Sequence, residues 1–196
     1  MTPPTIAIDY LANWPEFVDE LAQLSWKEWQ EIYQQREQTL EHCLKNYRER
    51  MNIDRLPLTL VAVHSGELDL KLGRSPNSLV ATLATLSSMS PLPPTPFPTT
   101  RLIGMVSLKF HDMDTRPDLD PWLGGLLVLP EWRNHGVGTM LMHRATEEAR
   151  RLKVSRLYLW THSAERLYRK LGWQVVERSD YFGKEAVVMQ MDLTRQ

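Results

Sequence analysis

A loop with two glycines and an arginine stands between an apolar run and an amphipathic stretch. Residues 126–129 are apolar and predict a strand that ends at Pro130, and helical spacing begins after the loop. The first N–H groups of a helix lack partners within the helix and, with the helix dipole, favour an anion. Gly136 and Gly138 let the backbone approach that anion without a Cβ in the way, and Arg133 adds a permanent cation. These residues predict a site for a phosphate or pyrophosphate group.

The spacing narrows the choice of phosphate ligand. A nucleotide P-loop would end in Gly-Lys-Ser/Thr, and a dinucleotide fingerprint would need a third glycine and an acidic residue about 20 positions further on. The string Val128-x-Pro130-x-x-Arg133-x-x-Gly136-x-Gly138 instead resembles the acetyl-CoA signature of the GNAT superfamily of N-acetyltransferases. A glycine-containing turn between strand and helix, with no ligand at all, is the alternative.

A second motif lies downstream, with one predicted strand between. It reads Ala164-x-x-Leu167-Tyr168-x-x-x-Gly172-Trp173 and resembles the second GNAT signature, Ala-x-x-Leu-Tyr-x-x-x-Gly-aromatic. Two motifs in the right order extend the resemblance over residues 102–193, whereas the N-terminal helices match in pattern only.

The resemblance implies a coenzyme site that uses acetyl-CoA as co-substrate. The pantetheine arm would be held by Leu126, Leu127 and Val128. The pyrophosphate would be held by backbone N–H groups of Asn134, His135, Gly136, Val137, Gly138 and Thr139, with Arg133 alongside. Thr161 stands where relatives often carry an Asn that bonds the coenzyme, so its hydroxyl is the candidate for that contact.

Acyl transfer from a thioester to an amine needs proton transfer at two points. By the resemblance, Tyr168 is the general acid that protonates the departing sulfur; a half-buried packing residue is the alternative. In many relatives a Glu on the strand before the glycine loop acts as the general base, but residues 122–129 contain no carboxylate. Deprotonation of the amine would then use ordered water, or one of His162, Asp120 and His111.

The acceptor side offers fewer signals. Trp29 and Trp122 are candidates for lining an acceptor pocket, with core packing as the alternative. The connection that carries Asp112, Asp114, Asp118 and Asp120 would attract a cationic amine, or is a solvated hairpin. No spacing of His, Cys and carboxylates suggests a metal site.

Composition excludes several classes of protein. The chain has 196 residues, a net charge of −1 and 42% hydrophobic residues, so we expect a globular protein that binds neither nucleic acid nor a membrane surface. No apolar run is long enough to span a bilayer, and the first residues lack the features of a signal peptide. The single cysteine, Cys43, indicates a reducing compartment, and we expect a cytoplasmic monomer or homodimer.

The pattern of elements predicts an α+β fold: a GNAT-type mixed, mostly antiparallel twisted sheet flanked by helices, in a single domain over residues 1–196. Expected strands cover residues 5–8, 58–64, 102–110, 122–129, 157–160, 173–176 and 186–193. A first helix would begin with Asn13 as its N-cap, and a second, longer helix would bury Tyr33, Leu40, Cys43, Leu44 and Tyr47. The Pro- and Ser-rich residues 71–100 are expected to form an insertion, either looping out or folded as a lid.

The function predicted from these features is N-acetyl transfer from acetyl-CoA to a primary amine, by direct attack in a ternary complex. The amine would belong to a small molecule or to a protein N-terminus. A catalytically silent GNAT fold that binds acyl-CoA as a sensor or interaction module is the alternative. A third possibility is an unrelated phosphate-binding protein, whose loop would accept ATP or NAD.

Overall fold

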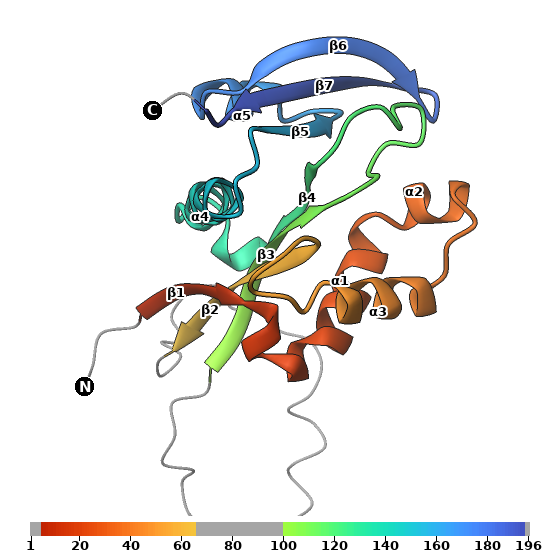
Figure 1. Cartoon of the computed structure of the whole chain (residues 1–196). Helices are drawn as coiled ribbons and strands as arrows, with labels where there is room; N and C mark the ends of the chain where they lie inside the picture. The colour runs from red at the N-terminus through yellow and green to blue at the C-terminus, as the bar shows by residue number, and fades with distance from the viewer. Residues whose placement is uncertain (1–4, 66–99, 195–196) are drawn as a thin grey trace, which may run out of the picture.

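The computed structural model describes residues 5–65 and 100–194, and within them a seven-stranded sheet in the order β1-β2-β3-β4-β5-β7-β6 (Figure 1). The strands are β1 (Thr5–Tyr10), β2 (Leu58–Ser65), β3 (Thr100–Lys109), β4 (Trp122–Val128), β5 (Arg156–Thr161), β6 (Gln174–Tyr181) and β7 (Lys184–Asp192). The α-helices are α1 (Val18–Glu28), α2 (Gln30–Gln35), α3 (Leu40–Glu49), α4 (Val137–Arg151) and α5 (Glu165–Lys170). Short 3₁₀ turns are η1 (Leu11–Asn13), η2 (Pro15–Phe17) and η3 (Pro130–Trp132). Apart from Thr100, which begins β3, the expected insertion at 71–100 lies outside the described residues.

The sheet is mixed and mostly antiparallel, as the sequence predicted. Strands β1 to β4 pair antiparallel in sequence order, and β5, β7 and β6 form a second antiparallel group. The two groups meet at β4 and β5, which run parallel. Because a parallel connection needs a crossover, α4 carries the chain from β4 back to the start of β5. The fold is a single domain around this one sheet.

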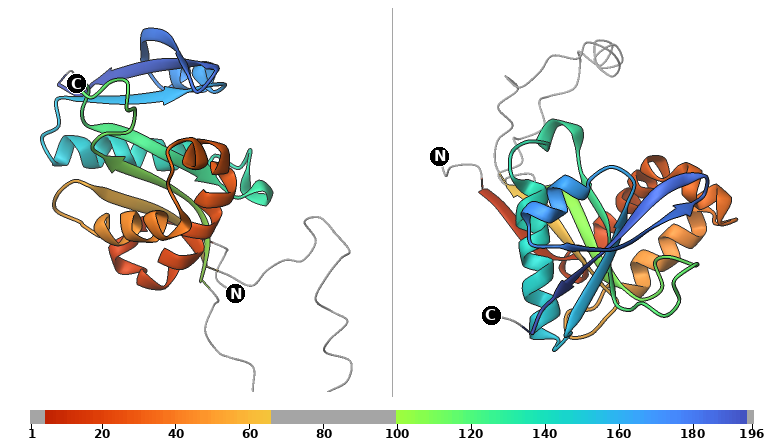
Figure 2. Two further views of the ribbon diagram at one scale, coloured as in Figure 1. Left: turned by 90° about the vertical axis from the view of Figure 1, so that its right-hand side faces the viewer. Right: turned by 90° about the horizontal axis from the view of Figure 1, so that it is seen from above.

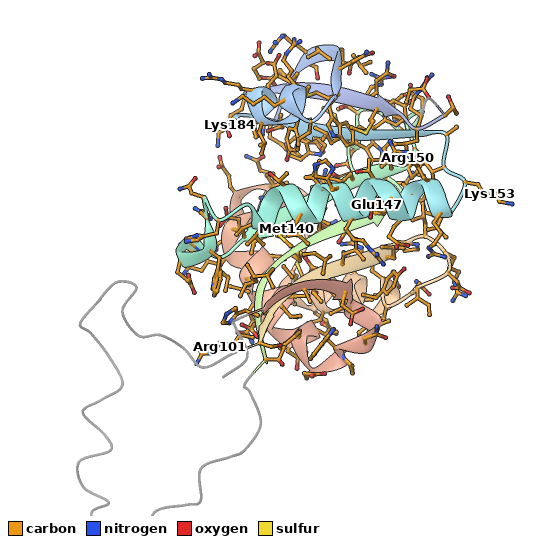
Figure 3. All side chains as sticks on the ribbon, turned by 90° about the vertical axis from the view of Figure 1, so that its left-hand side faces the viewer. Arg101, Met140, Glu147, Arg150, Lys153 and Lys184 are labelled. Atoms are coloured by element: carbon orange, nitrogen blue, oxygen red, sulfur yellow. The ribbon has the colours of Figure 1, made fainter. Side chains whose placement is uncertain are left out.

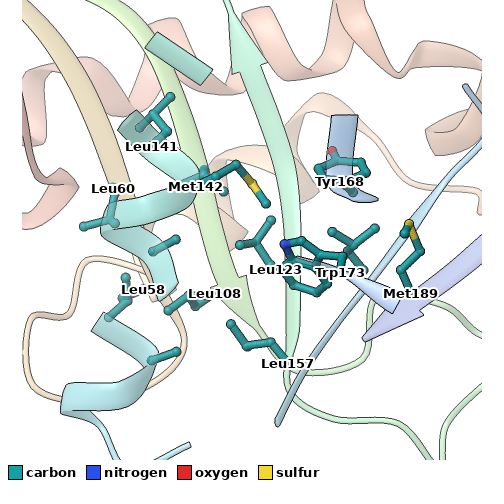
Figure 4. Packing of buried hydrophobic residues seen from close by; sticks show 14 of the residues in the cluster. Leu58, Leu60, Leu108, Leu123, Leu141, Met142, Leu157, Tyr168, Trp173 and Met189 are labelled. Carbon is teal, nitrogen blue, oxygen red and sulfur yellow. The ribbon is translucent and has the colours of Figure 1, made fainter. Parts of the chain in front are cut away.

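Helices cover both faces of the sheet, as the view from above shows (Figure 2). On one face α4 buries Leu141, Ala145 and Ala149 against the sheet, in the cluster drawn in Figure 4. On the other face α1 and α3 pack against a separate cluster. Strand β2 is buried along nearly its whole length, since its alternate side chains enter both clusters.

The outer face of α4 is polar and solvent-exposed. Glu147 and Arg150 lie on it, with the exposed Met140 nearer the start of the helix (Figure 3). Two basic residues, Arg150 and Arg151, stand in its last turn, where the negative end of the helix dipole stabilises them. Its first turn contains no acidic residue. Within the described residues, no helix is long and apolar enough to cross a membrane.

The N-terminal helices correct two predictions. Asn13 does not cap a helix: its side chain donates to Asp9 Oδ1 at 2.9 Å, and α1 begins only at Val18, after two 3₁₀ turns. The predicted long second helix is two helices, α2 and α3. Glu37 has a φ of 54° between them, and Thr39 starts α3 with a capping box that includes His42.

Strand β6 is also longer than the predicted 173–176, because it extends to Tyr181. Its exposed and half-buried residues alternate, including the charged Glu177 and Arg178, so it lacks the apolar run by which a buried strand is recognised.

Replacing Thr39 by Ala tests the capping box that divides the two helices. We expect Thr39→Ala to lower the free energy of unfolding by about 1 kcal/mol, because the first turn of α3 loses a side-chain acceptor. Chemical denaturation measures the change, with the exposed Gln34→Ala in α2 as control. Equal stabilities for the two variants would show that the cap does not hold the start of α3.

Candidate active site

Strands β4 and β5 diverge, and the site lies where they separate. Between these two fully described strands the register contains one pair, Trp122 with Tyr158, although β4 continues to Val128 (Figure 1). A bulge in β4 accompanies the divergence: its register against β3 shifts between Met105 and Ser107, and Gly125 has a φ of +65°. The far end of β4 therefore pairs on the β3 side alone.

The open side of β4 presents the backbone of Val128. The N–H of Leu129 donates to the carbonyl of Ile103 in β3 at 2.9 Å. Because neighbouring residues in a strand direct their backbone groups to opposite sides, the N–H and C=O of Val128 face away from β3. The Nε of Arg133 donates to that carbonyl at 3.1 Å, which is consistent with this orientation.

The glycine loop leads directly into the N-terminus of α4. Asn134 and Gly136 both have positive φ, 62° and 79°, and Gly136 is the N-cap of the helix. A glycine N-cap has no side chain to accept from the first-turn N–H groups. With no acidic residue in that turn, the positive end of a 15-residue helix is left for an external anion.

A pocket of about 400 Å³ joins the open strand edge to the helix start. Of the predicted coenzyme residues, it is lined by Leu126, Leu127, Val128, Arg133, Asn134, Gly136, Val137, Gly138 and Thr139. His135 is not among the lining residues; its Nδ1 lies 2.8 Å from the carbonyl oxygen of Arg133. The structure thus brings most of the predicted residues around one cavity.

Three further residues line this pocket that were not predicted from the sequence: Glu28, Trp132 and Leu167. Trp132 and Leu167 lie inside the two motifs, and their large apolar side chains were the sequence feature that could have predicted them as lining residues. Glu28 ends α1, and only the tertiary fold brings it to the loop. Its Oε1 lies 3.7 Å from the guanidinium of Arg133, and both side chains are about half exposed, so the pair stabilises the fold by at most about 1 kcal/mol.

Tyr168 lies in α5 within the cluster packed under α4 (Figure 4). Its ring meets Trp173 edge to face, with 6.3 Å between centroids, and 9% of the residue is exposed. Burial raises the pKa of the phenol to about 12, because the phenolate would lose its hydration. Tyr168 therefore stays protonated at neutral pH, which is the state that a proton donor requires.

The hydroxyl of Thr161 has local partners. Its Oγ1 accepts from the N–H groups of Ser163 at 3.3 Å and Ala164 at 2.9 Å, and so shapes the turn into α5. A hydroxyl has one proton to donate, and that donor is what Thr161 could offer to a coenzyme.

The three base candidates do not gather at this pocket. Asp120 and His111 hold each other, with 3.0 Å between Oδ2 and Nδ1. Asp120 lines another pocket, beside the C-terminal end of α4, together with Lys153 and Arg156. The side chain of His162 is turned to the carbonyl oxygen of Glu185, 2.8 Å away, and its ring meets Trp160 edge-on.

The two tryptophan candidates have different positions. Trp29 lies against the bulge: its ring would be 3.8 Å from a Cβ at Gly125. The expectation for Trp122 is corrected, because its side chain has no exposed surface. Its indole N–H donates to the carbonyl of Leu119 inside a packed aromatic cluster. Trp122 is therefore a core residue at the point where β4 and β5 separate, and it does not line a pocket.

The acidic connection before β4, for which a solvated hairpin was one of two alternatives, is exposed at Asp114 and Asp118 but buried at Asp112. Asp112 is 6% exposed and pairs with Lys109. The Nε of Arg36, which follows α2, lies 3.2 Å from Asp114 Oδ2, and its guanidinium also donates to the hydroxyl of Tyr181. One guanidinium therefore ties the α2–α3 link to the connection and to the β6–β7 hairpin. In the described part of the chain, no group of three or more His, Cys, Asp or Glu could hold a metal ion.

Comparison with known proteins agrees with this geometry. Residues 97–173 match the model of the acetyltransferase (GNAT) family, and no curated protein matches the chain. A GNAT-family acetyltransferase from Streptococcus pneumoniae has a TM-score of 0.58 at 16% identity, over 96% of this chain and 99% of that one. Aminoglycoside 6′-acetyltransferase type Ii has a TM-score of 0.56 at 16% identity, over 97% and 99% of the two chains.

A third solved structure, yncA from Salmonella typhimurium with its cofactor acetyl-CoA, has a TM-score of 0.54 at 15% identity, over 100% of this chain and 96% of that one. At these identities the structural likeness shows the fold, while the family match rests on the segment that carries both motifs. Residues 97–173, which contain both motifs, are thus similar to the acetyltransferase (GNAT) family, and the chain has the fold of these acetyltransferases.

Proposed function

We propose that this protein transfers an acetyl group from acetyl-CoA to a primary amine by direct attack in a ternary complex. The observation that carries the proposal is the pocket in which the open edge of β4 meets the N-terminus of α4. An extended arm and a pyrophosphate are the two chemical parts that such a pocket suits. Coenzyme A contains both.

The pantetheine arm can pair with β4 as another strand would, because it contains amides and the Val128 backbone faces the open side. The pyrophosphate then reaches the first turn of α4, where Val137, Gly138 and Thr139 supply N–H donors. Arg133 is within reach of both parts. A phosphate oxygen would be a stronger partner for its guanidinium than the half-exposed carboxylate of Glu28.

The reaction needs a neutral amine, a stabilised oxyanion and a protonated leaving group. A backbone N–H on the open side of β4 can donate to the oxyanion of the tetrahedral intermediate. Tyr168 supplies the proton for the sulfur, since burial keeps its phenol neutral. For the acceptor we propose the two classes expected from the sequence, a small-molecule amine or a protein N-terminus. The buried free thiol of Cys43 supports a reducing, cytoplasmic setting.

The glycine at the start of α4 gives a test of coenzyme binding. Gly136→Ala forces a side chain into a φ of +79° and should cost about 1–2 kcal/mol of stability. It should also weaken binding of acetyl-CoA, measured by calorimetry, because the loop that presents the N–H groups is distorted. Gly183→Ala is the matched control, since Gly183 has a φ of +74° in the β6–β7 hairpin and, like Gly136, has no atom near its Cβ position. Equal loss of binding in both variants would contradict the proposed coenzyme site.

Tyr168→Phe tests the proton donor. We expect the rate of thiol release from acetyl-CoA to fall by tenfold or more, while calorimetric binding of acetyl-CoA stays within about twofold, because one hydroxyl is lost from a packed ring. A turnover rate equal to that of the unmodified protein, at neutral and at raised pH, would show that Tyr168 is a packing residue.

A further inference from the structure

A buried ion pair stands beside the diverging strands. Lys109, at the end of β3, is paired in register with Trp122, and its Nζ lies 2.5 Å from Oδ1 of Asp112. The exposed fractions of the two side chains are 16% and 9%. Removing two charges from water is costly, so stability alone does not account for an ion pair in this position, and we expect it to have a functional role.

The carboxylate of Asp112 occupies the space of a side chain missing from β4. A Cβ built on Gly124 would lie 2.6 Å from Asp112 Oδ2 and 2.8 Å from Lys109 Cε. Gly124 precedes the bulged residue Gly125 and stands two residues before Leu126, which lines the coenzyme pocket. The fold thus places a carboxylate against β4 although β4 has no acidic residue of its own.

We propose that Asp112 is the general base that takes the proton from the acceptor amine, directly or through one water molecule. The inference rests on the proposed function, because it requires an amine at this end of the coenzyme pocket. Residues 122–129 contain no carboxylate, and the β3–β4 connection brings one against Gly124 from outside the strand.

The transfer balances with residues already described. The proton of the ammonium passes to Asp112, and the freed electron pair on nitrogen forms the C–N bond with the acetyl carbon. The C–S bond breaks, its electron pair stays on the coenzyme sulfur, and that sulfur takes a proton from Tyr168. The nitrogen of the new amide loses its remaining positive charge by releasing a second proton to water, and water exchanges protons with Asp112 and Tyr168 before the next cycle.

Charged and titratable groups from three elements face the pair. Tyr33 comes from α2, Arg36 from the link after α2 and Arg50 from the end of α3. Burial raises the pKa of the Tyr33 phenol above its usual value, so Tyr33 stays neutral at neutral pH. Burial lowers the pKa of Lys109, while Asp112 opposes that change. The pH dependence of the reaction must therefore be measured with Lys109 replaced as well.

The test compares Lys109→Met, Asp112→Asn and the double variant, which removes both charges and leaves no unpaired buried ion. The control is Glu148→Gln, a carboxylate in α4 with 4% side-chain exposure that pairs with Arg144 and Arg151. Two probe acceptors are used at saturating acetyl-CoA: the polyamine, aminoglycoside or peptide N-terminus that the unmodified protein acetylates fastest, and hydroxylamine, which is neutral at neutral pH. Rates are corrected for the uncatalysed reaction.

We expect the double variant to lose about 100-fold or more in kcat with the ammonium-type acceptor, which is the usual size of a general-base effect. Its affinity for acetyl-CoA should stay within about twofold, and the deficit should shrink with hydroxylamine and at raised pH. Glu148→Gln should keep the kcat of the unmodified protein. Lys109→Met should retain far more activity than the double variant, since it keeps the carboxylate.

Two results would overturn the assignment of Asp112: an unchanged kcat in the double variant, or a loss of equal size for both acceptors at every pH. The proposed function fails separately, if the unmodified protein acetylates none of the amines.

Discussion

The separation of β4 from β5 is the constraint on which the rest of the structure depends. The strands are joined at Trp122 and Tyr158, and beyond that pair one edge of β4 has no strand beside it. A strand edge left without partners is costly when it is removed from water, so a ligand with amide groups is favoured there. The bulge at Gly125 bends β4 away from β5, and the buried Trp122 fixes the point from which the two strands diverge.

Positive and negative groups lie at opposite ends of the part of β4 that diverges from β5. At the far end of β4, Arg133 and the N-terminus of α4 supply positive potential for phosphates. Near the point of divergence, the carboxylate of Asp112 lies against Gly124. A thioester held along β4 would have its charged nucleotide at the first end and its reactive carbonyl toward the second. That arrangement suits transfer to a cationic acceptor, because the acceptor meets a carboxylate and not the phosphate-binding cation.

Much of the fold and the position of the glycine loop could be predicted from sequence because the determining contacts are local. The apolar run before Pro130, the glycines of the loop and the helical spacing after it lie within one short stretch, and the pocket contains nearly all of the residues expected from it. The positions of Trp122, Glu28 and Asp112 could not be predicted from such local patterns. Trp122 is buried by residues of β5, β6 and β7, Glu28 reaches Arg133 from α1, and Asp112 fills the gap at Gly124 from a connection. Each depends on tertiary packing, and the break between α2 and α3 was hidden because an apolar stripe continues across it.

The most direct test of the central claim is amide hydrogen exchange across residues 126–139, with and without acetyl-CoA. A second arm uses 3′-phosphoadenosine 5′-diphosphate, which has the phosphates of the coenzyme but no pantetheine arm. The account predicts that acetyl-CoA protects both the open edge of β4 near Val128 and the first turn of α4, whereas the nucleotide protects the helix turn alone. If saturating acetyl-CoA left the exchange of Val128 unchanged, the open edge of β4 would not be the binding surface for the pantetheine arm.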